Sequence, residues 1–395
     1  MTSPSGPPQG AGGYSGQAPT QAYNPGGAGP GSHGAPPNNG GLQQEVHTLE
    51  RAIFEVKRII VGQDQLVERM LVGLLAKGHV LLEGVPGVAK TLAVETFAKV
   101  VGGTFARIQF TPDLVPADIV GTRIYRQGSE KFDVELGPVF VNFLLADEVN
   151  RAPAKVQSAL LEVMAERQVS IGGETYPVPQ PFLVMATQNP IEQEGVYPLP
   201  EAQRDRFLFK IVVGYPTDIE EREIVYRVGV RAPEPATVLD SQQLIRLQER
   251  ADAVFVHNAL VDYAVRLVFA TREPARYGVS DVAQLIQYGA SPRASLGIVR
   301  AARALALMRG RDYALPQDLA DIAPDVLRHR LVLSYDALAD DIPADRIVER
   351  IMQAVPLPTV SPRQSAAPNP TDFVLPPTAT PNGGPAPLPA WPTRP

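Results

Sequence analysis

A glycine-rich loop between an apolar run and a helical pattern constrains this chain more than any other feature. The loop reads Gly84-Val85-Pro86-Gly87-Val88-Ala89-Lys90-Thr91, after the apolar residues 79–82 and at the start of helical spacing over residues 91–101. Backbone N–H groups at a helix N-terminus attract anions, and glycines let a ligand approach the backbone closely. Lys90 would then reach the β and γ phosphates of a nucleotide, and the Thr91 hydroxyl would bind Mg²⁺. The loop predicts a nucleotide site, with Ala89 in place of the glycine of the general pattern.

Two further apolar runs end in polar residues suited to phosphate chemistry. Asp147 and Glu148 follow residues 141–146, and Asn189 lies three residues beyond residues 182–186. Ligands of open α/β sheets bind at the carboxyl ends of strands. We expect Asp147 to hold the Mg²⁺ shell, Glu148 to orient and polarise the attacking water, and the Asn189 amide to bond the γ phosphate or that water. Each signal alone is typical of a turn, and their place after the phosphate loop favours the site.

Arginines supply a weaker signal. Arg204 and Arg206 lie in the segment 200–207, where basic residues near a helix end are expected for dipole reasons alone. Ser291 as N-cap and Pro292 at the first position predict a helix with Arg293 in its first turn. The helix dipole disfavours a cation there by roughly 0.3–1 kcal/mol. A bound phosphate would offset that cost; the alternative is a solvated arginine that tolerates it.

The order of patterns predicts an α/β fold with a mostly parallel central sheet flanked by helices. The expected strands are residues 79–82, 105–110, 140–146, 182–187 and 207–212, alternating with helical stretches such as 91–101 and 154–167. Residues 168–181 predict a hairpin around Gly172-Gly173. Residues 116–137 have weak periodicity and are interpreted as a loop insertion.

Composition divides the chain into four parts. Residues 1–43 are expected to be a disordered Gly/Pro-rich tail, because the first 41 residues hold no Asp, Glu, Lys or Arg. Residues 44–216 would form the nucleotide-binding domain and residues 217–353 an all-helical lid domain. Residues 354–395 would be a Pro-rich disordered tail, either a solvated linker or a ligand for an aromatic groove.

Charge and cysteine content limit the function classes. The net charge of −6 disfavours generic nucleic-acid binding, which usually shows a basic surface. The chain has no cysteine, which excludes disulfides and thiolate metal sites and suits a reducing cytoplasm. We expect a soluble protein with no membrane span, because no apolar run approaches about 18 residues.

Three motifs in this order resemble the MoxR family of AAA+ ATPases, a helix-2-insert branch, and its actinobacterial members in particular. They are the loop ending in Thr91, then Leu145-Ala146-Asp147-Glu148-Val149-Asn150-Arg151-Ala152-Pro153, then Ala186-Thr187-Gln188-Asn189-Pro190-Ile191-Glu192. The resemblance covers about residues 44–353, and Ala89 is the family's usual residue. It implies an AAA+ P-loop core with a helical lid, an insertion at residues 116–137 and a hairpin at residues 168–181.

The resemblance also implies roles for individual residues. Asn189 corresponds to sensor 1, Arg206 to the arginine finger and Arg293 to sensor 2, with Arg204 left open as the alternative finger. Val61 and Gly62 would lie near the adenine.

The activity implied is Mg²⁺-dependent ATP hydrolysis by a ring, plausibly a hexamer, because an arginine finger acts on the neighbouring subunit's nucleotide. Family members act as chaperone-like remodelling machines, often with von Willebrand factor A domain partners, and help insert metal cofactors into client proteins. Two alternatives stay open: a DNA-dependent or chelatase-type AAA+ motor, and a nucleotide-gated scaffold with little turnover.

Overall fold

The computed structural model describes residues 39–359 except 86, 129, 191–195 and 229–232. Pro86 of the phosphate loop, Ile191 and Glu192 of the third motif, residues 1–38 of the expected tail 1–43, and residues 360–395 of the expected tail 354–395 lie outside the described residues. Contacts join the described residues from Gly40 onward into one compact unit, so the boundary expected at residue 216 stays a prediction. No helix among the described residues is long and apolar enough to cross a bilayer.

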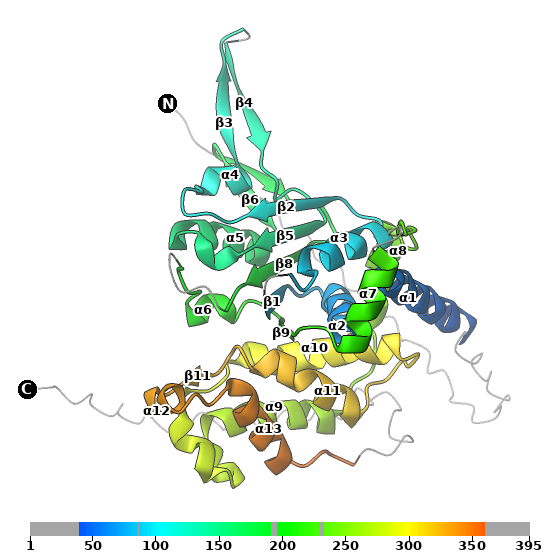
Figure 1. Ribbon diagram of the computed structural model, residues 1–395, viewed down its shortest axis with the longest axis vertical. Coiled ribbons are helices and arrows are strands. Elements are labelled where there is room, and N and C mark those ends of the chain that lie inside the picture. The colour runs from blue at the N-terminus through cyan, green and yellow to red at the C-terminus, as the bar shows by residue number, and fades with distance from the viewer. Residues whose placement is uncertain (1–38, 86, 129, 191–195, 229–232, 360–395) are drawn as a thin grey trace, which may run out of the picture. The chain divides into compact units, whose positions relative to one another are not determined.

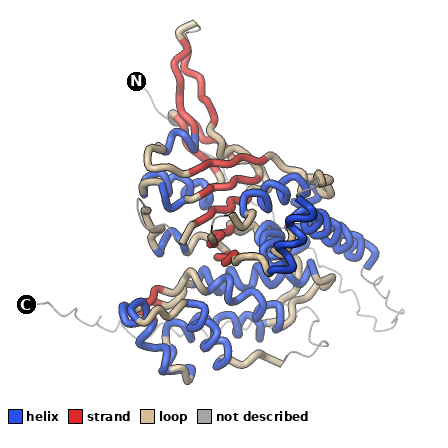
Figure 2. Tube along the Cα trace, viewed as in Figure 1, coloured by secondary structure: helices blue, strands red, loops and turns tan. Residues whose placement is uncertain are grey.

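Five parallel strands form the central sheet, as the sequence predicted (Figure 1 and Figure 2). In spatial order they are β2 (Phe105–Gln109), β5 (Phe143–Asp147), β8 (Leu183–Gln188), β1 (Val80–Gly84) and β9 (Phe209–Val213). The strands read as nearly continuous apolar runs because both faces of the sheet are covered. Every expected strand is confirmed, which also confirms the α/β class.

Side chains alternate between two apolar clusters on the two faces of the sheet. Val80 and Leu82 belong to one cluster, and Leu81 between them belongs to the other. The first face is covered by α2 (Asp64–Leu75) and α3 (Lys90–Val100), and the second by α5 (Ala154–Glu166). Helix α1 (Asn39–Ile59) contributes buried residues to the first cluster.

The N-terminal boundary was predicted too late in the chain. Helix α1 begins at Asn39, whereas the sequence placed disorder up to residue 43. Leu42 packs against the first apolar cluster, and this contact extends the helix into the Gly-rich segment. A single apolar residue among glycines was too weak a signal to show it.

The two insertions are both hairpins. Strands β6 (Gln168–Ile171) and β7 (Glu174–Pro177) pair as the turn chemistry predicted. The loop predicted at 116–137 is wrong: it contains α4 (Pro116–Val120) and the antiparallel pair β3 (Gly121–Arg126) and β4 (Lys131–Leu136). This hairpin extends away from the sheet and is exposed on both faces (Figure 1). Strand β4 alternates, with Phe132, Val134 and Leu136 apolar, but β3 does not, so the two strands did not stand out together.

The C-terminal part is mainly helical, but the all-helical prediction is wrong. Strands β10 (Ile286–Tyr288) and β11 (Val332–Leu333) form a short antiparallel ribbon, too short to give a detectable period. The remaining elements after the sheet are short 3-10 turns and the helices α7 (Asp218–Val228), α8 (Ser241–Asp252), α9 (Asn258–Arg272), α10 (Pro292–Met308), α11 (Pro316–Leu327), α12 (Tyr335–Ala339) and α13 (Ala344–Ala354).

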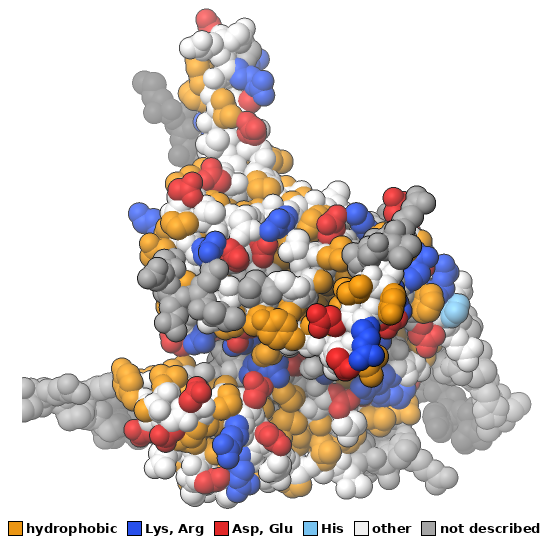
Figure 3. Space-filling model, viewed as in Figure 1, with side chains coloured by type: hydrophobic (Ala, Val, Ile, Leu, Met, Phe, Trp, Pro, Cys, Tyr) orange, Lys and Arg blue, Asp and Glu red, His pale blue; other side chains and the backbone are white. Residues whose placement is uncertain are grey.

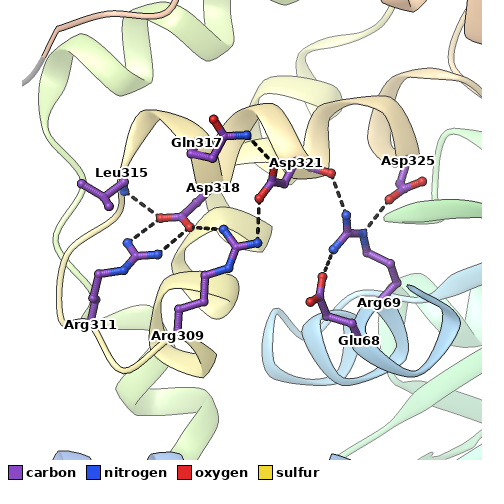
Figure 4. Close-up of polar contacts among 9 residues, drawn as sticks. All are labelled: Glu68, Arg69, Arg309, Arg311, Leu315, Gln317, Asp318, Asp321 and Asp325. Carbon is purple, nitrogen blue, oxygen red and sulfur yellow. Dashed lines mark hydrogen bonds and ion pairs between the residues drawn. The ribbon is translucent and has the colours of Figure 1, made fainter. Parts of the chain in front are cut away.

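Buried ion pairs join α11 to α2 (Figure 4). Arg69 donates from Nε to Asp325 at 2.6 Å and from Nη2 to the backbone oxygen of Asp321 at 2.7 Å. Asp325 is almost fully buried and also accepts from Arg328 at 2.5 Å. Removing one partner of such a pair leaves an uncompensated buried charge, so these contacts hold the helical part against the sheet domain.

Candidate nucleotide site

The phosphate loop connects β1 to α3, as predicted. Gly84 ends β1 where a Cβ would lie 2.4 Å from the backbone oxygen of Val213, so only glycine allows this approach of β9. Ala89 precedes α3 with φ 56° and ψ 24°, in the left-handed region. That conformation costs an L-residue roughly 1–2 kcal/mol. Replacing the glycine of the general pattern by Ala89 therefore adds backbone strain as well as a methyl group.

Lys90 lies between the loop and the acidic pair. Its Nζ donates to the backbone oxygen of Gly84 at 2.5 Å. Burial lowers the pKa of Lys90, while the charges of Asp147, Glu148 and Glu83 raise it in opposition. The lysine therefore lies within the field of the two carboxylates, where a cation can bridge them to an anionic ligand.

The acidic pair lies at the carboxyl end of β5, and its two carboxylates have separate partners. Asp147 is 8 % exposed; it accepts from the Thr187 hydroxyl at 2.6 Å and from Nη2 of Arg107 at 2.6 Å. Glu148 follows the strand with φ 55°, and its carboxylate accepts from Nε2 of Gln109 at 2.7 Å. Because the two groups are held differently, they can serve the two tasks expected of them, metal binding and water activation.

Thr187 and Asn189 lie at the same edge of the sheet. Ala146 of β5 pairs with Ala186 of β8, so Asp147 lies beside Thr187. The Thr187 oxygen also accepts from the backbone N–H of Glu148 at 2.8 Å, which ties the last residues of both strands together. Asn189 is buried directly after β8. The structure thus brings together the polar ends of three runs that the sequence singled out separately.

Sequence reasoning missed two residues of this site, Arg107 and Gln109 on β2. Gln109 pairs with Asp147 in the sheet register, and Arg107 reaches both Asp147 and Gln109. The signal was present, because these are polar residues at alternating positions of an otherwise apolar run. It required knowing that β2 is the neighbour of β5.

Mg²⁺ fits the oxygen donors at this edge. Thr91 is in the first turn of α3 and Asp147 at the end of β5, so a hydroxyl and a carboxylate are available. Mg²⁺ is commonly bound by one or two carboxylates together with substrate phosphates rather than by a protein cage. Accordingly, the described residues contain no cluster of three or more His, Cys, Asp or Glu side chains that could hold a metal alone.

A small apolar cavity of about 100 Å³ lies beside the loop, on the side expected for the adenine. Val61 lines it together with Leu92, Pro216 and Ile224. Gly62 does not line it; its φ is 73°, and a Cβ there would lie 2.4 Å from Cδ of Glu220. Of the two residues expected near the adenine, Val61 lines this cavity, and Gly62 shapes the turn beside it.

Arg206 and Arg293 lie away from this edge. In the sheet Val213 pairs with Gly84, whereas Phe209 pairs with Val80, so Arg206 precedes β9 at the amino edge. Four residue steps of strand separate the two edges by about 13 Å. Arg293 lines the same cavity as Arg206, together with residues that precede β1 and with none of the described residues of the phosphate loop. Neither arginine therefore meets the phosphate loop of its own chain.

The same two arginines line a cavity of about 360 Å³ with Arg167, Arg300 and Arg330. Nη1 of Arg206 donates to the backbone oxygen of Leu161 at 2.6 Å. Nη1 of Arg293 lies 3.3 Å from Asp205, so a carboxylate within the chain offsets the unfavourable position of this cation at the helix N-terminus.

Arg204, the alternative finger, does not line this cavity and lies 3.7 Å from Glu201.

On the face seen in Figure 3, acidic and basic side chains are interspersed rather than gathered by sign.

Comparisons with known proteins agree with this geometry. Residues 79–209 match the family described as ATPase family associated with various cellular activities (AAA), and residues 279–351 match the AAA lid domain. The chain is 71 % identical to Chaperone MoxR1 of Mycobacterium tuberculosis over 91 % of this chain and 94 % of that protein. It is 32 % identical to Protein MoxR of Methylorubrum extorquens over 77 % and 93 % of the two chains.

A solved structure of a candidate ATPase from Cytophaga hutchinsonii superposes with a TM-score of 0.76 at 47 % identity, covering 80 % of this chain and 97 % of that one. Family, fold and the geometry of the loop and acidic pair all agree. The chain belongs to the MoxR family of AAA+ ATPases, and it is an enzyme that hydrolyses ATP to ADP and phosphate.

Proposed function

We propose that this protein hydrolyses MgATP at sites shared between neighbouring copies of a closed ring, a hexamer. One copy supplies the loop from Gly84 to Thr91 and the acidic pair, and the next supplies Arg206 and Arg293. Head-to-tail contacts that close generate rings, and each contact then holds one composite site.

The separation of the two sets of residues is the observation that carries this proposal. Arg206 and Arg293 share one cavity at the amino edge of the sheet, while Lys90 and Asp147 lie at the carboxyl edge. An arginine that stabilises transition-state charge accelerates hydrolysis by about 10³–10⁵. That gain is available here only if the arginine comes from another copy.

Within one copy, each residue then has a defined task. The loop N–H groups and Lys90 would bind the β and γ phosphates, and Thr91 and Asp147 would hold Mg²⁺, which would supply positive charge next to the phosphates. Glu148 orients the attacking water and accepts its proton, and Asn189 supports the water or the γ phosphate. Val61 contacts the base.

The ring would use this energy to remodel other proteins. The support is the similarity to Chaperone MoxR1, which extends over most of both chains. By resemblance to the family, we propose maturation or metal-cofactor insertion of a client, with a von Willebrand factor A domain protein as partner. The cytoplasmic location and the lack of a nucleic-acid partner expected from the sequence stay predictions; ATP turnover with and without DNA checks the second.

Mixing two inactive variants tests the shared site. Arg206→Ala lacks the arginine, and Glu148→Gln lacks the water-activating carboxylate. In a mixed ring, a site formed by the loop of an Arg206→Ala copy and the arginine of a Glu148→Gln copy is intact, so turnover should recover partly. If rings form and no mixing ratio restores turnover, the arginine does not act between copies.

A further inference from the structure

A single carboxylate, that of Asp205, connects the two arginines of the cavity. Asp205 directly precedes Arg206, and its carboxylate accepts from the Ser291 hydroxyl at 2.8 and 3.0 Å. It also accepts from Nε of Arg330 at 2.9 Å and lies 3.3 Å from Nη1 of Arg293. Ser291 is the N-cap of α10, so one side chain links the segment before β9 to the start of that helix.

Arg330 fixes Asp205 from the buried side. Its side chain is only 3 % exposed, and its guanidinium donates to the backbone oxygens of Phe207 at 2.5 Å and Leu208 at 3.1 Å. Burial lowers the pKa of Arg330 to about 10, while Asp205 opposes that shift, so the arginine is charged near neutral pH. Arg330 Nη2 also donates to the backbone oxygen of Asp205 at 3.2 Å, so the backbone on both sides of Arg206 is held by charge-assisted contacts.

The two ion pairs of Asp205 differ in burial and in length. Arg330 is buried, whereas the Arg293 side chain is 56 % exposed and its contact is longer. Exposed pairs contribute little and exchange readily. Of the described residues that line the cavity, Asp205 is the one acid among six cations, which are Lys77, Arg167, Arg206, Arg293, Arg300 and Arg330. Arg293 can therefore leave Asp205 for a phosphate while Arg330 keeps Asp205 in place.

We propose that Asp205, locked by Arg330, is a positioning residue that sets the spacing of Arg206 and Arg293 for the phosphates of the neighbouring copy. Asp205 does not touch the nucleotide; it acts through the two arginines. This inference rests on the shared site proposed above. It predicts that, in mixed rings, an Asp205 variant behaves like an arginine variant and not like a variant of the acidic pair, although Asp205 is itself a carboxylate.

The test is a set of pairwise mixtures with Asp205→Asn. The variant alone should lose roughly 100-fold in kcat, the usual effect of a displacement of about 1 Å, with unchanged ATP affinity. Mixed with Glu148→Gln it should regain turnover, because the loop of one copy meets intact arginines of the other. Mixed with Arg206→Ala it should stay inactive, because both variants are defective on the same side.

The control mixture of Glu148→Gln with Arg206→Ala separates the two proposals. No recovery there rejects the shared site itself. If that control recovers, then recovery of Asp205→Asn with Arg206→Ala, or failure to recover with Glu148→Gln, overturns the positioning role. Asp281→Asn is the matched surface control, since Asp281 pairs with Arg350 on the helical part and should leave turnover unchanged.

A milder variant guards against loss of folding, since Asp205→Asn removes the carboxylate partner of a buried arginine. Ser291→Ala removes the hydroxyl contact to Asp205 and the N-cap bond from the Arg293 N–H, and it leaves the Arg330 pair intact. It should give a smaller loss of kcat with the same mixing pattern, and Ser291→Thr, which keeps a hydroxyl, should restore activity. If Ser291→Ala recovers with Arg206→Ala instead, the positioning role is rejected.

Discussion

Replacing Glu148 with Gln should separate ATP binding from hydrolysis. The Glu148 carboxylate accepts from Gln109 at 2.7 Å and lies 3.1 Å from Nη1 of Arg151, and its backbone N–H donates to Thr187. Glutamine has the same length and keeps an oxygen that can accept from Gln109. The change therefore removes the charge and the proton-accepting ability while the local geometry is kept.

The size of the effect follows from these contacts. A positioned general base contributes typically 10²–10⁴-fold, so the barrier should rise by about 3–5.5 kcal/mol. ATP binding depends on the loop, Lys90 and Mg²⁺, so it should persist. Folding should change little, because the Arg151–Glu148 pair is partly exposed and such pairs contribute at most about 1 kcal/mol.

Phosphate release and nucleotide titration on the same preparation measure the two quantities. Glu162→Gln, an exposed position on α5, is the matched control and should hydrolyse ATP as the parent does. Equal turnover by Glu148→Gln and the parent would refute the assigned role. Parallel loss of ATP binding would also refute the reasoning, since it would show that Glu148 holds the ligand.

Three other predictions concern stability. Ala89→Gly removes the cost of a left-handed φ, roughly 1–2 kcal/mol, and adds about 0.5–1 kcal/mol for the greater flexibility of glycine in the unfolded chain. The free energy of unfolding measured by chemical denaturation should therefore rise by up to about 1 kcal/mol. A clear decrease in that free energy would contradict the strain. Arg69→Met leaves the buried Asp325 without one partner and should cost about 3 kcal/mol in the same assay, whereas a loss below about 1 kcal/mol would show that the pair does not hold α11. Burial lowers the pKa of His79 from 6.5 to about 4, so the unfolded chain binds more protons between these values. Stability should be full above pH 6.5 and fall by about 2 kcal/mol at pH 5, and a His79 imidazole titrating near 6.5 by NMR would contradict this.

The nucleotide side of the site could be predicted from the sequence because its residues end buried strands. A parallel strand covered on both faces reads as a nearly continuous apolar run. The change from apolar to polar or glycine residues therefore locates the end of the strand in the sequence. Gly84 and Asp147 are such boundaries. Parallel strands place these boundaries at one edge, and the site follows from their order along the chain.

Features without a buried face, or made by distant contacts, could not be predicted. The hairpin β3–β4 is exposed on both sides; β4 alternates apolar and polar residues, but β3 does not, so the sequence carried no paired signal for two strands. The contact of Asp205 with Arg330 joins residues 125 positions apart, and that of Arg69 with Asp325 spans 256. Such pairs form when the helical part packs against the sheet domain. Hydrophobic periodicity predicts individual helices and strands, but it does not predict which distant residues meet.

The measurement closest to the central claim is a structure of the assembled protein with Mg²⁺, ADP and aluminium fluoride as a mimic of the transferred phosphoryl group. The account predicts the mimic beside Lys90 and Glu148 of one copy and within hydrogen-bond distance of Arg206 from the next. A mimic contacted by no arginine of another copy, or by Arg206 of the same chain, would contradict it.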